Sequence, residues 1–171
     1  GNKYTKKDLS SLLEQANIAL VREGICYLKD LPVSLFFVDL DKTDKKEERF
    51  RFEDYFEGEF FHWDTQTTQN IDTPKIRDIA LGLLTPHLFV RIKSKIKNIT
   101  QPFIYCGSLK FMEHEVKTAN PAHIIFRSVD YDDFTANEDL QNIYLWSPSK
   151  IGKNTQSEIS KKSEVSKERL V

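Results

Sequence analysis

The chain has 171 residues, of which 39% are hydrophobic and 12% aromatic, and its formal net charge is −1. A chain of this size can bury roughly 70% of its unfolded surface, so we expect one folded domain that needs no disulfide or metal. The composition excludes a disordered protein, the short apolar runs exclude a membrane span, and the near-neutral charge excludes a uniformly basic surface for nucleic acid.

The N-terminal region predicts a helix followed by two strands. Thr5 stands three residues before Asp8, an Asp form of the capping box, and apolar residues follow at helical spacing: Leu9, Leu12, Leu13 and Ala16. Residues 25–28 are expected to form a short strand, and the Phe- and Val-rich run at residues 33–40 a buried strand.

A charged connection and two further strands come next. Residues 41–48 are dense in charge and are expected to form a solvated hairpin tip. Residues 49–53 alternate charged and ring side chains, which predicts a half-buried strand. Residues 54–58 are predicted to turn the chain into an aromatic strand at residues 60–64.

The aromatic strand runs into a polar stretch, residues 65–69. In a strand, Phe61 and Trp63 share one face, while Phe60, His62 and Asp64 share the other. The polar stretch can both donate and accept hydrogen bonds, as a site that reads a base edge or a sugar requires. The alternative is a core strand that enters a polar loop.

The C-terminal half predicts a helix, four strands and a last helix. Residues 74–81 are expected to be helical, with Thr73 as the cap and Gly82 near the end. The strands are expected at residues 87–93, 101–106, 109–115 and 123–129, and the last helix at residues 137–146. Short strands at regular spacing predict an α+β fold, with a strongly curved, mainly antiparallel sheet or a small β-barrel and flanking helices.

We expect residues 1–146 to form a single globular domain. Residues 147–171 are rich in Ser, Lys and Glu and carry six cationic and three anionic side chains. We expect this segment to dock on the domain or on a neighbour. The first residue is Gly rather than Met, so we expect a fragment of a longer protein or a chain left after removal of a tag.

Four cations at alternate positions suggest a contact with a nucleic-acid backbone. On one extended strand they would point to the same side, about 6.6 Å apart, close to the phosphate spacing of a nucleic-acid strand: Arg91, Lys93, Lys95 and Lys97. The alternative is an edge strand that lysines protect against aggregation, with Ser94 in a hairpin turn that breaks the row.

Base recognition would use aromatic and polar side chains near the aromatic strand. Trp63 and Tyr105 could stack unpaired bases, and Asp64 or Gln66 could hydrogen-bond a base edge. The alternative, which we expect for most of the rings in this region, is that Phe61, Trp63, Phe103 and Tyr105 belong to the core.

The remaining reactive side chains predict no complete active site. Cys26 and Cys106 have no metal or redox spacing, so we expect buried thiols of a cytoplasmic protein, and the four histidines are expected to be structural. An acidic cluster is typical of a magnesium-dependent nuclease but lacks a nearby lysine on the same strand: Asp54, Glu57, Glu59 and Asp64. No metal or cofactor site is predicted.

Several segments, taken in order, resemble one family. The resemblance covers roughly residues 3–130 and rests on six segments: residues 4–13, 35–38, 53–56, 60–66, 87–91 and 103–107. They look like the uncharacterised C-terminal domain attached to DEAD/DEAH-type helicases, which often also carry a phospholipase D-like or other nuclease domain, as in type IV restriction enzymes. Asp64-Thr65 stand where that family usually has a polar pair ending in Ser, and the segment after Asp132 has no counterpart.

The resemblance implies a non-catalytic DNA-binding, target-recognition module of a restriction-type helicase–nuclease, with a modified base as one option for the target. It also favours a curved barrel of the base-flipping type, similar to SRA or PUA-like readers. Its partners would be double-stranded DNA and the helicase and nuclease domains of the same parent chain. The alternatives are a coupling domain that packs on the helicase without touching a base, and a small metal-dependent nuclease.

Overall fold

The protein is described by a computed structural model, which places residues 1–21, 24–43, 53–65, 69–114 and 122–148. Eight strands form the main sheet: β1 (Lys3–Tyr4), β2 (Ile25–Tyr27), β3 (Val33–Asp39), β4 (Tyr55–Glu57), β5 (Phe60–Asp64), β6 (Thr85–Arg91), β9 (Phe103–His114) and β10 (His123–Ser128). Two further strands form a separate hairpin: β7 (Lys95–Ile96) and β8 (Ile99–Thr100). The helices are α1 (Lys6–Leu12), α2 (Asn17–Leu20), α3 (Pro74–Ala80) and α4 (Glu138–Leu145).

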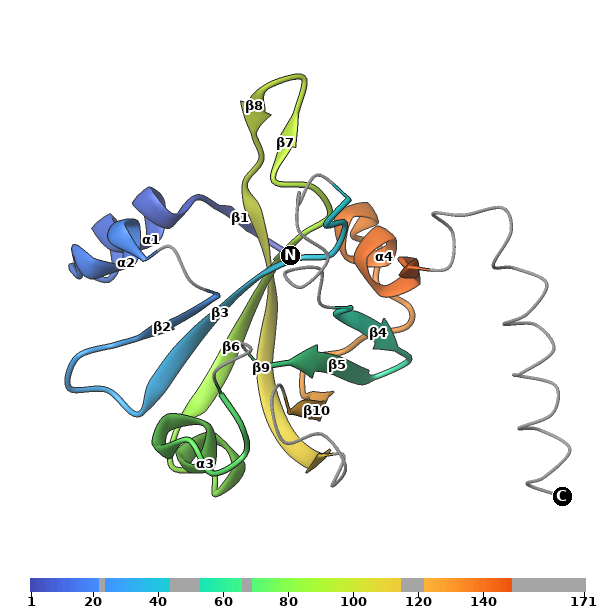
Figure 1. The fold of residues 1–171 in the computed structure, drawn as a ribbon. Helices are drawn as coiled ribbons and strands as arrows, with labels where there is room; N and C mark the ends of the chain where they lie inside the picture. The colour runs from blue at the N-terminus through green and yellow to red at the C-terminus, as the bar shows by residue number, and fades with distance from the viewer. Residues whose placement is uncertain (22–23, 44–52, 66–68, 115–121, 149–171) are drawn as a thin grey trace, which may run out of the picture.

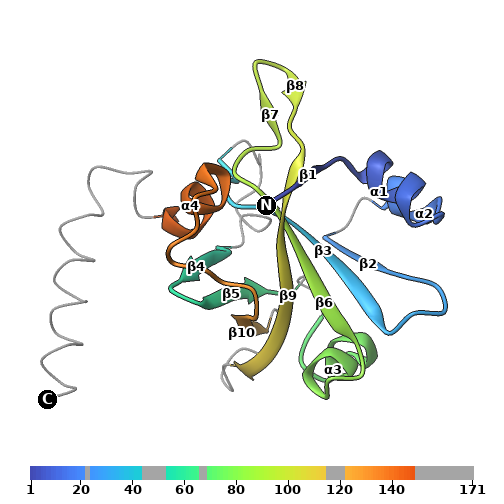
Figure 2. The ribbon, with the colours of Figure 1, turned by 180° about the vertical axis from the view of Figure 1, so that it is seen from behind.

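The strands of the main sheet follow the order β2-β3-β6-β9-β10-β5-β4, with β1 paired to β9 (Figures 1 and 2). β3 and β6 are parallel, and the other described pairs are antiparallel. The chain between β3 and β6 passes through β4, β5 and α3. The predicted α+β class with a mainly antiparallel sheet is therefore confirmed. No described helix has the length and hydropathy to cross a membrane.

β9 is the strand that joins the two halves of the sheet, because it pairs with β6 near its start and with β10 towards its end. The register with β6 shifts between His87 and Phe89, which marks a β-bulge. Gly107, at the bulge, has a φ of 88°, and a Cβ there would overlap the Asp130 side chain. Only glycine meets both constraints, so this bend in the sheet depends on Gly107.

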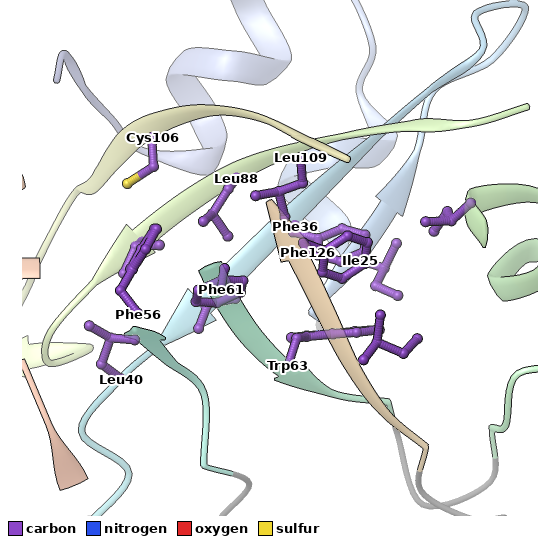
Figure 3. Packing of buried hydrophobic residues seen from close by; sticks show 14 of the residues in the cluster. Ile25, Phe36, Leu40, Phe56, Phe61, Trp63, Leu88, Cys106, Leu109 and Phe126 are labelled. Atoms are coloured by element: carbon purple, nitrogen blue, oxygen red, sulfur yellow. The ribbon is translucent and has the colours of Figure 1, made fainter. Parts of the chain in front are cut away.

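The larger hydrophobic cluster lies between the two halves of the sheet (Figure 3). Phe36 on β3 packs against Trp63 on β5, with ring centroids 4.7 Å apart, and against Phe126 on β10 at 5.7 Å. These strands are well separated in the strand order, so the sheet must curve strongly to bring them together. α3 and α4 add Ile76, Ile79 and Ile143 to the same cluster.

The expected curvature is confirmed, but the alternative of a closed barrel is wrong. β2 and β4, with three residues each, are the two ends of the strand order and do not pair with each other. Closure would require a continuous hydrogen-bond ladder between them. Large side chains, including those from α3 and α4, fill the space between the two halves of the open sheet.

A smaller cluster covers the opposite face of the sheet, under α1 and α2. The capping box of α1 is confirmed: Asp8 N–H donates to Thr5 Oγ1 and Thr5 N–H donates to the Asp8 carboxylate. The apolar residues at helical spacing do not all pack inward, because Leu9 is buried whereas Leu12 is 66% exposed. The helix ends at Leu12, and Glu14 takes the left-handed conformation.

Several strand boundaries predicted from the sequence differ from those in the structure. The strands predicted at 101–106 and 109–115 are one strand, β9, with the bulge in its middle, and the turn predicted at 54–58 contains β4. The strand predicted at 49–53 lies almost wholly outside the described residues, and so does most of the extension predicted at 147–171. Both cysteines are buried free thiols, as predicted, and burial raises the pKa of Cys106 to about 12.

Candidate nucleic-acid interface

The aromatic strand β5 alternates faces as predicted, but its tryptophan belongs to the core. Phe61 and Trp63 are 0% and 6% exposed, while Phe60, His62 and Asp64 are partly exposed. The indole of Trp63 packs against Phe36 and Phe126 within the core, and its burial leaves no open face for a base. Gln66, the other polar residue expected to read a base, lies outside the described residues.

Tyr105 lies on the other side of the sheet from Trp63. It packs against the smaller cluster, whereas Trp63 belongs to the larger one. Its hydroxyl is 2.7 Å from His87 Nδ1, and burial raises the pKa of Tyr105 and lowers that of His87. Trp63 and Tyr105, both considered as base-stacking residues, therefore do not form one stacking pocket.

Asp64 is part of a polar chain that sequence spacing did not reveal. Its carboxylate accepts from His123 Nδ1 at 2.6 Å, and His123 Nε2 is 3.0 Å from His62 Nδ1. Tyr55 stacks on His62, with centroids 4.5 Å apart, and Glu57 Oε2 is 3.7 Å from His62 Nε2. These residues meet because β10 pairs with β5 and β5 pairs with β4. His62 and His123 are 61 positions apart, so only knowledge of the strand pairing could have predicted their contact.

The acidic cluster of the nuclease hypothesis is divided among separate partners. Asp54 is 4% exposed and pairs with Lys42 at 2.5 Å, while it also accepts from Asp64 N–H. Burial raises the pKa of Asp54, and the Lys42 ammonium opposes this shift. Glu59 pairs with Arg127 instead. Within the described ranges, no three His, Cys, Asp or Glu side chains gather where they could hold a metal ion.

The four cations predicted to form one row lie in four different places, two on strands and two in the connections between strands. Arg91 ends β6, and Lys95 begins β7. Lys93 lies in the bend between them, and Lys97 in the turn between β7 and β8. A single extended row is therefore wrong, and the hairpin turn that breaks it is centred on Lys97 rather than on Ser94.

Arg91 is occupied by structural contacts. Its guanidinium bonds to the Asp39 carboxylate at 2.5 Å and to the Gln101 carbonyl oxygen at 3.1 Å, and it lies 4.2 Å from the centre of the Phe103 ring. Arg91 is only partly exposed, and its stacking on Phe103 and its pairing with Asp39 stabilise the start of the hairpin. Arg91 would therefore have to give up these contacts to hold a phosphate.

The β7–β8 hairpin projects from the rest of the fold (Figures 1 and 2). Lys95 pairs with Thr100 and Ile96 with Ile99, so the loop has two residues. These two, Lys97 and Asn98, both have positive φ, 50° and 64°, as a type I′ turn requires. This tight turn places the exposed Lys97 at the end of the projecting hairpin.

The hairpin carries most of the free positive charge in this region. Lys93, Lys95 and Lys97 are all exposed. Lys93 Nζ lies 3.7 Å from Asp41, while no ion pair is recorded for Lys95 or Lys97 among the described residues. We call these three lysines, with the turn residue Asn98, the hairpin surface.

A pocket of about 160 Å³ opens at the base of the hairpin, between it and α4. Two cations at its margin, Lys3 and Lys93, are 58% and 55% exposed. Each is paired with a carboxylate, Lys3 with Asp139 at 3.3 Å and Lys93 with Asp41 at 3.7 Å. An anionic group entering this pocket would have to compete with these two exposed pairs, which are individually weak.

The fold is an α+β domain built on an open, strongly curved sheet with a projecting hairpin. Residues 1–132 match the family described as Domain of unknown function (DUF3427), and the chain belongs to this family. The match begins before β1 and ends after β10, so it includes the whole main sheet and the hairpin. A comparison with curated proteins found no match.

Proposed function

We propose that this chain is a non-catalytic DNA-binding module of a restriction-type helicase–nuclease, and that it holds the DNA backbone through the hairpin surface. The observation that carries the proposal is the projecting β7–β8 hairpin, whose exposed lysines stand clear of the fold. A narrow two-stranded ribbon of this kind can enter a groove of the duplex, where side chains reach both backbone and base edges.

The charge of the hairpin surface decides the kind of binding that we expect. Lys95 and Lys97 would contact phosphates directly, and Lys93 would contribute after it leaves Asp41. So few cations on a chain of net charge −1 predict modest affinity with a shallow salt dependence. Such a module would help to position the whole helicase–nuclease on DNA and would not hold the duplex by itself.

Backbone contact replaces base stacking by Trp63 in this proposal. Trp63 is buried, and Tyr105 is on the opposite side of the sheet. Asp64 keeps a partly exposed side chain, although His123 holds its carboxylate. We therefore propose no base-reading pocket on β5.

The test is a fluorescence-anisotropy titration of duplex DNA at several salt concentrations, with the double variant Lys95→Ala/Lys97→Ala. Removing two phosphate contacts should lower the slope of log affinity against log salt by about 1.8, and weaken binding at 0.15 M salt by about 30-fold. The double variant Lys95→Arg/Lys97→Arg keeps both charges and should retain the wild-type slope.

The matched control removes two exposed lysines elsewhere, Lys29 in the β2–β3 turn and Lys110 on β9. Lys29→Ala/Lys110→Ala makes the same change in net charge and should leave the slope unchanged. An equal loss of affinity in this control would show that overall charge, not the hairpin surface, determines binding. No binding by the wild-type chain at low salt would refute the proposed function.

A second candidate function, a coupling domain that packs on a helicase, has one observation in its favour. Large apolar side chains are exposed outside the hairpin, including Leu20 at 78% and Phe134 at 95%. Exposed apolar residues of this size are typical of protein contacts when they form one patch. This function would be favoured if the wild-type chain binds no DNA but binds the helicase domain of its parent protein.

A further inference from the structure

The tip of the β7–β8 hairpin exposes two isoleucines beside its lysines. Ile96 and Ile99 are direct partners in the register, on either side of the two-residue turn, and they are 51% and 67% exposed. Opposed residues of a hairpin project from the same face, while Lys95 and Thr100 project from the other. The tip therefore has one apolar face and one cationic face.

The position of this isoleucine pair suggests that it contacts a partner. β-Branched residues favour strands, but threonine or valine would serve that purpose with less exposed apolar surface. Neither isoleucine belongs to the two hydrophobic clusters of the fold. The pair thus lies outside the core, on a hairpin that projects from the fold (Figure 2), and Ile96 also lines the pocket at the base of that hairpin.

We propose that Ile96 and Ile99 form an apolar wedge that inserts at a base step from the minor groove and kinks the bound duplex. This inference rests on the proposed function and adds its mode of binding. Apolar side chains inserted from the minor groove partly unstack neighbouring bases, and the bend brings more protein surface against the DNA.

The chemistry around the wedge favours DNA over a protein partner. Lys97 and Asn98, at the turn, are side chains that donate to the base acceptors of the minor groove. Lys93 and Lys95 both lie on the segment that leads from β6 into the tip and would meet the phosphates on one side of it. A protein partner that covered the isoleucines would bring these lysines close to its own surface and would need several carboxylates to match them.

The test uses the full chain and a duplex that carries 2-aminopurine at a central base step and fluorescein at one end. Insertion unstacks the 2-aminopurine and raises its fluorescence, while the anisotropy of fluorescein reports binding. The wild-type chain should produce both signals. Binding without any rise in 2-aminopurine fluorescence, at any position of the probe along the duplex, would overturn the wedge and leave backbone binding intact.

The variant Ile96→Thr/Ile99→Thr keeps the β-branched shape and removes the apolar ends of both side chains. Each buried methylene contributes about fourfold in affinity, so losing several should weaken binding at least about tenfold and abolish the fluorescence rise. The slope against salt should stay the same because no cation is lost. Wild-type affinity with a full fluorescence rise in this variant would contradict the wedge.

The matched control is Leu81→Thr/Leu83→Thr, which removes two exposed apolar side chains, 66% and 61% exposed, next to α3. It should bind and unstack DNA like the wild type. If it lost affinity as strongly as the isoleucine variant, general surface hydrophobicity would explain the result and the wedge would be wrong. If the wild-type chain gave neither signal, the proposed function would fail, and the wedge with it.

Discussion

We expect Trp63→Leu to destabilise the fold without changing the affinity for DNA. The indole is 6% exposed, and its ring lies 4.7 Å from Phe36 and 6.2 Å from Phe126. Full truncation of a buried Trp costs about 3–5 kcal/mol, and leucine refills part of the space, so a loss of about 2–3 kcal/mol in the free energy of unfolding is expected. Urea unfolding followed by circular dichroism measures this loss.

A base-stacking Trp63 would give the opposite pattern. Stacking contributes about 1–3 kcal/mol per base, so its removal would weaken DNA binding by about 5- to 150-fold, with little effect on stability. The control is Phe61→Leu, which changes a fully buried ring on the same strand and face. Both variants should bind DNA like the wild type when titrated below their unfolding midpoints. A loss of affinity confined to Trp63→Leu would refute the assignment of Trp63 to the core.

Two further predictions concern the bulge in β9 and the cap of α1. Gly107→Ala should cost about 3–5 kcal/mol, because it adds left-handed strain and displaces the Asp130 carboxylate from Ser108 N–H. In an Asp130→Ala background only the strain of about 1–2 kcal/mol should remain, and equal costs in both backgrounds, measured by urea unfolding, would contradict this account. Hydrogen bonds from Thr5, first from its backbone N–H, lower the pKa of the exposed Asp8 carboxyl. Its stabilising contribution is therefore present above the ordinary carboxyl pKa and lost as pH falls through the lowered native value, so Asp8→Asn should destabilise the fold at pH 7 and not at strongly acidic pH. A pH-independent difference in thermal midpoint would show that the charge of Asp8 has no role.

Local sequence patterns predicted the elements whose stability depends on near neighbours. The capping box of Thr5 and Asp8 and the alternating faces of residues 60–64 are confirmed, because a hydrogen bond across three residues and the period of a strand are local properties. The strands at β2, β3, β6 and β10 were also placed within a few residues. Their apolar and β-branched residues favour the extended conformation, whichever strands become their neighbours in the sheet.

The candidate site was harder to predict, because its geometry depends on the partners of each strand. A row of cations at alternate positions indicates a shared face only if one strand continues through all of them. Here β6 ends at Arg91 and the chain turns at Lys97 and Asn98, which removes the row and creates a projecting hairpin. Non-glycine residues with positive φ are difficult to foresee, since most side chains disfavour that conformation.

The sequence by itself determined the α+β class, the mainly antiparallel pairing of the strands, the buried thiols and which side chains on β5 share a face. Only the tertiary structure decided that Trp63 and Tyr105 lie on opposite sides of the sheet, that His62 meets His123, and that the sheet remains open. The physical reason is the range of the interactions. Caps and strand alternation act within a few residues, whereas strand order, the bulge at Gly107 and the packing between the halves of the sheet join residues far apart in the chain.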